Sequence, residues 1–148
     1  MKKTIFILFI FIASCGYKPI YLNNNLKNIE YNKINIDGEI EIGKKIINSL
    51  SLRENTSNKQ LSDLTLFSSF KIDEIAKNSK GQTETYRSSI VVSVKIIDDQ
   101  KIIKNKTFSD DFTYNKKNNK FELTEYQEDV KNQLVNRIIE DLILFLNM

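Results

Sequence analysis

The chain has 148 residues, 22 basic and 19 acidic side chains, one cysteine and no histidine. This composition excludes zinc sites built from histidine and cysteine, and any catalytic triad with an imidazole base. The small net charge of +3, without a basic stripe, also argues against nucleic acid as a partner.

The first residues, 1–14, have the pattern of an export signal peptide. Lys2 and Lys3 precede an apolar run, 5–13, that leads through small residues to Cys15. As a helix this run would rise only about 13 Å, against a hydrocarbon core of about 30 Å, so it is too short to span a bilayer. We therefore predict export followed by cleavage.

The only cysteine of the chain lies directly after this run. Ile12, Ala13, Ser14 and Cys15 resemble a bacterial lipobox, whose cysteine is acylated and becomes the mature N-terminus. We predict Cys15 as a lipid-attachment residue, because several acyl chains hold a protein on a membrane where one holds it only marginally. The alternative is an ordinary signal peptide with an incidental cysteine at its boundary. Gly16, rather than aspartate, follows the cysteine, as in lipoproteins that are sent on to the outer membrane.

The mature chain suits a tether and one domain. Residues 15–28, with Pro19 and three successive asparagines, are predicted as a lipidated tether. Residues 29–148 are predicted as one α+β domain. Removal of the signal peptide leaves 20 basic and 19 acidic residues, so the mature chain is nearly neutral.

The first half of the domain alternates between β-branched and helical patterns. A strand is expected over 29–36, followed by Asp37 as the N-cap of a helix that starts near Glu39. The polar segment 51–63 is expected to be a loop, and period-two alternation predicts a strand over 64–72. The apolar positions of the helix are Ile42, Ile46, Ile47 and Leu50.

The second half contains a β-hairpin and a long helix. Two β-rich segments, 86–97 and 101–114, flank a short polar turn at 98–100. Thr124 and Gln127 form a capping-box pattern that predicts a helix over 125–147. The residues expected on one face of the hairpin are Ile90, Val92, Val94, Ile96, Ile102, Phe108, Phe112 and Tyr114.

These elements follow the order β-α-β-β-β-α. The order predicts a small two-layer α+β sandwich, with a mostly antiparallel sheet and two helices on one face. Such a sheet leaves its other face or an edge open to a partner.

The start of the mature chain carries a resemblance to a known family. Residues 15–21 (CGYKPIY) after a lipobox resemble the N-terminus of the LPS-assembly lipoprotein family (LptE), and the element order with its long closing helix is similar as well. The resemblance implies a lipid-anchored domain on the periplasmic side of the outer membrane. It implies that the domain plugs a large β-barrel protein of the LptD type, with lipopolysaccharide as a candidate second partner. It implies no catalysis and no cofactor.

Arg87 and Lys95 are the candidate residues for contact with lipopolysaccharide. Both lie on the rising strand of the hairpin, where we expect them on opposite sides, and lipid A phosphates would favour such cations through charge-assisted hydrogen bonds. The alternative for each is a solvated charge at the rim of the sheet.

Two other classes of function compete with this interpretation. Glycosidases use a pair of carboxyl groups in catalysis, and this chain has acidic pairs such as 98–99 and 110–111. Neighbouring residues of a strand, however, point to opposite faces. We therefore expect no catalytic residue, no metal site and no enzyme. The other competitor is a different envelope lipoprotein, such as a pilotin-like chaperone or an accessory subunit of another outer-membrane complex.

Overall fold

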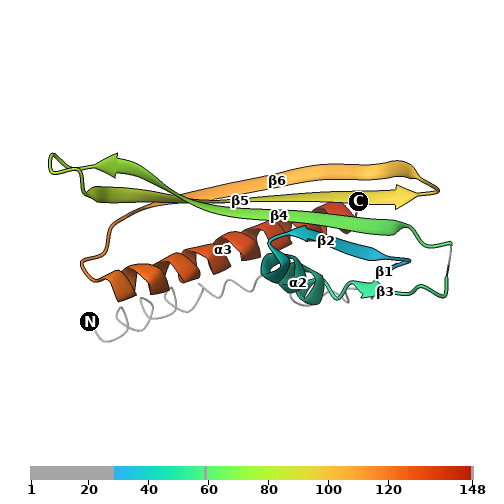
Figure 1. Cartoon of the computed structure of the whole chain (residues 1–148). Coiled ribbons are helices and arrows are strands. Elements are labelled where there is room, and N and C mark those ends of the chain that lie inside the picture. Colours follow the sequence, from blue (N-terminus) through green and yellow to red (C-terminus); the bar gives the residue numbers. More distant parts are fainter. Residues whose placement is uncertain (1–28, 59, 148) are drawn as a thin grey trace, which may run out of the picture.

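The computed structural model describes residues 29–58 and 60–147. The predicted signal peptide and the predicted tether, with Cys15, lie outside these residues. Figure 1 shows a long, twisted sheet with two helices on one of its faces. The elements are β1 (Glu30–Tyr31), β2 (Ile34–Gly38), α2 (Ile40–Ser49), β3 (Arg53–Glu54), β4 (Asp63–Lys77), β5 (Thr83–Asp98), β6 (Lys101–Asn115) and α3 (Lys120–Asn147).

The main sheet has the strand order β2-β4-β5-β6. β4, β5 and β6 pair antiparallel along their whole length, and β2 joins the edge of β4 in parallel. With 15 or 16 residues each, the three long strands reach about 50 Å. The predicted α+β class, the mostly antiparallel sheet and the two helices on one face are confirmed.

The single strand expected over 29–36 is wrong, because the chain changes partner within it. β1 pairs with β3, with Glu30 opposite Arg53, whereas β2 pairs with β4, with Ile34 opposite Leu64. The expected loop over 51–63 therefore contains a short strand. These partners are 20 to 30 residues away, so local pattern alone does not reveal the break.

The start of α2 also differs from the expectation. Asp37 belongs to β2 and does not cap the helix, whose N-cap is Glu39 without a side-chain cap. Gly38, at φ +78°, turns the chain, and a Cβ there would collide with the carbonyl oxygen of Ser68. Strand pairing thus extends as far as the glycine and moves the helix start past Asp37.

The hairpin β5–β6 forms as predicted but contains a bulge. Ile96 pairs with Lys104 and Ile97 with Ile102, which leaves Ile103 as an extra residue. The expectation that Ile102 shares a face with Phe108 is wrong, because one extra residue shifts the alternation of side chains to the other face.

The last helix begins earlier than its capping-box pattern indicates. Asn119 is the N-cap, since its Oδ1 accepts a hydrogen bond of 2.9 Å from the amide of Phe121. Thr124 lies inside the helix, where its hydroxyl donates to the carbonyl of Lys120 at 3.1 Å. The capping-box prediction is therefore wrong, and α3 gains a further turn.

The core lies between the helices and the sheet. α2 packs on β2 and β4, and α3 on β5 and β6. Gly43 lets α2 approach β2 closely, because a Cβ there would collide with the side chain of Ile36. The least exposed core side chains are Ile42, Ile46, Leu50, Leu64, Leu66, Ile90, Val92, Val94, Val130, Leu134, Ile138 and Leu142.

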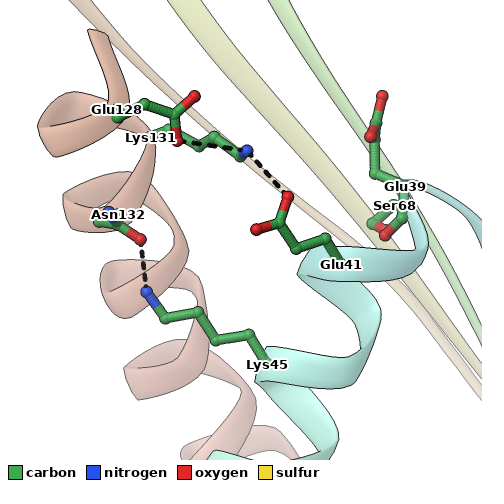
Figure 2. Close-up of polar contacts among 7 residues, drawn as sticks. All are labelled: Glu39, Glu41, Lys45, Ser68, Glu128, Lys131 and Asn132. Atoms are coloured by element: carbon green, nitrogen blue, oxygen red, sulfur yellow. Dashed lines mark hydrogen bonds and ion pairs between the residues drawn. The ribbon is translucent and has the colours of Figure 1, made fainter. Parts of the chain in front are cut away.

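Polar contacts also join the two helices (Figure 2). Lys45 donates a hydrogen bond of 2.7 Å to Asn132. The side chain of Lys131 is only 17% exposed, and its ammonium lies 3.3 Å from the carboxylate of Glu41 and 3.5 Å from that of Glu128. Burial lowers the pKa of Lys131, but the two carboxylates outweigh it and leave that pKa above its usual value.

Candidate functional site

The face of the sheet that the helices leave uncovered is the candidate surface of the described domain. Along β5 the even-numbered residues from 88 to 96 are buried beneath the helices, and the odd-numbered residues point to the other side. Neighbouring strands keep the same alternation. We call this surface the outer face; its main side chains are Asn35, Asp37, Thr65, Phe67, Ser69, Lys71, Arg87, Ser89, Val91, Ser93, Lys95, Asn105, Thr107, Ser109, Asp111 and Thr113.

The outer face is rich in hydroxyl groups and carries a few exposed apolar side chains between them. Ser93 and Thr107 lie opposite each other and share a hydrogen bond of 2.8 Å. Phe67 is 43% exposed and Val91 is 37% exposed on the same face. Hydroxyls both donate and accept hydrogen bonds, so this surface suits a polar partner better than a hydrocarbon one.

Arg87 is partly engaged by its neighbours on β6. Its Nε lies 3.7 Å from a carboxylate oxygen of Asp111 and donates a hydrogen bond of 3.4 Å to Thr113. The side chain remains half exposed. Because exposed ion pairs are weak, Arg87 stays available to an anion, but it shares its charge with a local carboxylate.

Lys95 has a different environment. It lines a shallow hollow of about 340 Å³ on the outer face, together with Asp37, Thr65, Phe67 and Ser93. Within 29–58 and 60–147, no carboxylate oxygen comes within 4 Å of its ammonium. The hollow thus combines a cation, a carboxylate, hydroxyls and an exposed aromatic ring.

The expectation that Arg87 and Lys95 lie on opposite sides of the strand is wrong. Both are odd-numbered residues of β5, which pairs with β4 without a bulge between these positions, so both project from the outer face. Eight positions along a strand separate them by about 26 Å. The structure therefore puts both cations on one surface but does not bring them into one site.

The acidic pair at 110–111 diverges, as the sequence predicted, whereas Asp98 and Asp99 line one recess at the β5–β6 turn. Asp110 lies toward α3 and pairs with Arg137 at 3.0 Å, whereas Asp111 lies on the outer face beside Arg87. Among the described residues, no group of three or more His, Cys, Asp or Glu side chains is placed to hold a metal ion. None of the helices in this part of the chain is long and apolar enough to cross a bilayer.

The fold matches solved lipoprotein structures, although no family profile and no curated protein matches the sequence. Rare lipoprotein B from Shewanella oneidensis superposes with a TM-score of 0.59 at 7% identity, over 78% of this chain and 93% of that one. A lipoprotein B from Nitrosomonas europaea gives 0.55 at 9% identity, over 86% and 87% of the two chains. A minor lipoprotein from Acinetobacter baumannii gives 0.52 at 14% identity, over 77% and 89%.

The domain has the rare lipoprotein B fold. The neighbours are lipoproteins by name, which agrees with the lipobox at 12–15 of this chain. The superposition covers most of both chains. At identities of 7 to 14%, it establishes the fold, and the function needs arguments from this chain's own residues.

Proposed function

We propose that the chain is an outer-membrane lipoprotein that assembles with, and plugs, a β-barrel translocon of the LptD type for delivery of lipopolysaccharide to the cell surface. The observation that carries this proposal is the coincidence of two independent features. One is the lipobox with the motif CGYKPIY at 12–21, and the other is the rare lipoprotein B fold of residues that lie after it. In this proposal the acyl chains on Cys15 hold the domain on the periplasmic side of the outer membrane.

The uncovered outer face supports a role inside a barrel. The lumen of an outer-membrane barrel is polar, and a plug needs polar side chains on the surface that meets it. Hydroxyls such as Ser93 and Thr107 dominate the outer face, and the mature chain is nearly neutral. The rigid pairing of β4, β5 and β6 holds these groups at fixed spacing.

Lys95 is the better candidate of the two cations for contact with lipopolysaccharide. Its hollow offers an ammonium to a phosphate, hydroxyls to a sugar, and the ring of Phe67 to an apolar sugar face. Arg87 pairs with Asp111 at 3.7 Å, whereas Asp37, which also lines the hollow, forms no ion pair with Lys95. We expect Lys95→Glu to weaken crosslinking to lipopolysaccharide more than Arg87→Glu. Lys44→Glu, at an exposed position of α2 on the opposite side of the domain, is the matched control.

Affinity purification tests the proposed partner. The tagged chain is isolated from detergent-solubilised outer membrane, and the co-purifying proteins are identified by mass spectrometry. A large barrel protein of the LptD type is the expected result. A secretin would instead support the alternative, a pilotin-like chaperone, and the absence of any outer-membrane protein would refute the proposed assembly. The proposed role involves no enzymatic step and no cofactor.

A further inference from the structure

The end of the domain at the β5–β6 turn exposes an unusual pair of aliphatic side chains. Ile102 and Ile103 are each 52% exposed, although they lie within a long, paired strand. Ile97, opposite Ile102, is partly exposed as well. With Lys101 and Lys104 on either side, these three isoleucines form what we call the tip patch.

The backbone maintains this exposure. The bulge at Ile103 moves Ile102 out of phase with the buried Phe108, so the core does not cover it. The turn itself is tight, and Asp99 (φ +43°) and Gln100 (φ +64°) both adopt left-handed conformations. Bulges re-aim side chains, so the pairing of β5 with β6 keeps Ile102 exposed.

Cations surround the tip patch on both faces of the sheet. Lys101 and Lys95 are exposed beside it, and the ammonium of Lys104 lies on the covered side, 5.6 Å from the ring centroid of Phe145. The acidic residues of the turn, Asp98 and Asp99, line a recess on the side of β1. Aliphatic side chains flanked by lysines suit the interface of an anionic bilayer.

The chain enters the domain at this same end. Asn32 lines the recess with Asp98 and Asp99, and its amide donates a hydrogen bond of 2.7 Å to Asp63. Figure 1 shows β1 and the β5–β6 turn at the right-hand end of the molecule, far from the start of α3. The segment that carries Cys15 therefore joins the fold beside the tip patch.

We propose that the tip patch docks on the surface of a bilayer that contains anionic phospholipid, as a second membrane contact beside the N-terminal lipid. The proposal rests on the lipid attachment in the proposed function, which brings this end to the membrane. Ile102 and Ile103 enter the headgroup region, and Lys101 contacts lipid phosphates.

Vesicle flotation tests the docking without help from an acyl chain. The mature chain from residue 15, carrying Cys15→Ser, is mixed with phosphatidylcholine vesicles with or without phosphatidylglycerol. We expect binding to the anionic vesicles, reduced at least about tenfold by Ile102→Asn with Ile103→Asn. Lys101→Gln should weaken it about fivefold. Phe121→Asn is the matched control, because Phe121 is 74% exposed at the opposite end of the domain and should be dispensable.

A fluorescent label reports the docking directly if the double variant loses stability. In the Cys15→Ser chain, Ile103→Cys supplies the only thiol for an environment-sensitive dye. The emission should shift to the blue on anionic vesicles, and a dye at Phe121→Cys should not shift. Absence of binding by the unacylated chain, equal binding by the isoleucine variant, or equal shifts at both positions would overturn the proposal. Mass spectrometry of the natural N-terminus tests the lipid attachment separately, so the two claims can fail independently.

Discussion

Replacement of Gln100 by glycine should stabilise the domain. Gln100 is the second residue of the two-residue turn between β5 and β6, and its φ is +64°. Turns of this kind, with positive φ at both central residues, normally carry Asn-Gly or Asp-Gly. Here Asp99 fits that preference and Gln100 does not. The other long hairpin has a glycine, Gly81 (φ +76°), in its turn.

The size of the effect follows from two opposing contributions. A left-handed backbone costs a residue with a Cβ about 1–2 kcal/mol, which glycine avoids. Glycine also has more freedom in the unfolded chain, which reduces the gain by about 0.5–1 kcal/mol. The expected net increase in the free energy of unfolding is about 0.5–1 kcal/mol, equal to a rise of about 2–4 °C in Tm for a domain of this size.

Urea and thermal unfolding, followed by circular dichroism, measure the change. Ser79→Gly is the matched control, because Ser79 lies in the other hairpin turn and is not among the described residues with positive φ. Glycine there should lower stability by about 0.5 kcal/mol. A Tm for Gln100→Gly equal to or below that of the wild type, or a gain of the same size for Ser79→Gly, would refute the reasoning from backbone conformation.

Three further predictions concern the helices and the anchor. Gly43→Ala should lower the free energy of unfolding by about 1–3 kcal/mol in urea titrations, despite the better helix propensity of alanine, because the new Cβ collides with Ile36; an unchanged midpoint would contradict the close packing of α2 on β2. Lys131 has a raised pKa in the folded state, so its contribution to stability is complete below its unfolded pKa of about 10.4 and is lost as pH rises through the higher folded value. The wild type should therefore lose stability more steeply above about pH 10 than Lys131→Met, and parallel pH profiles would exclude this contribution. Cys15→Ala should release the protein from the membrane fraction into the periplasm, and globomycin should make the precursor accumulate; unchanged fractionation and processing would exclude lipid attachment.

The long strands and their buried face were predictable from the sequence, because alternation is a local property. Ile90, Val92, Val94 and Ile96 follow one another at period two, and all four are buried. The same alternation predicts that Asp110 and Asp111 point apart, as they do. The lipobox at Cys15 is likewise local, and it remains a prediction because it lies outside the described residues.

The candidate site was only partly predictable. Arg87 and Lys95 were candidates because of their positive charge, and the structure puts both on the outer face. Strand parity alone puts both residues on one face, because an even number of positions, eight, separates them. The hollow at Lys95 was not predictable, since it requires Asp37 from β2 and Phe67 from β4 to lie beside β5.

The sequence by itself determined the periodicity of each element and therefore the fold class. The tertiary structure decided the positions where elements start, end and change phase, because these depend on partners distant in the chain. β1 and β2 are separate strands because each pairs with a different partner. Ile102 points outward because β6 pairs with β5 across a bulge. Asn119, and not Thr124, is the N-cap of α3. Side-chain chemistry selects what a segment can form, but pairing and packing select which of those forms gives the lowest free energy.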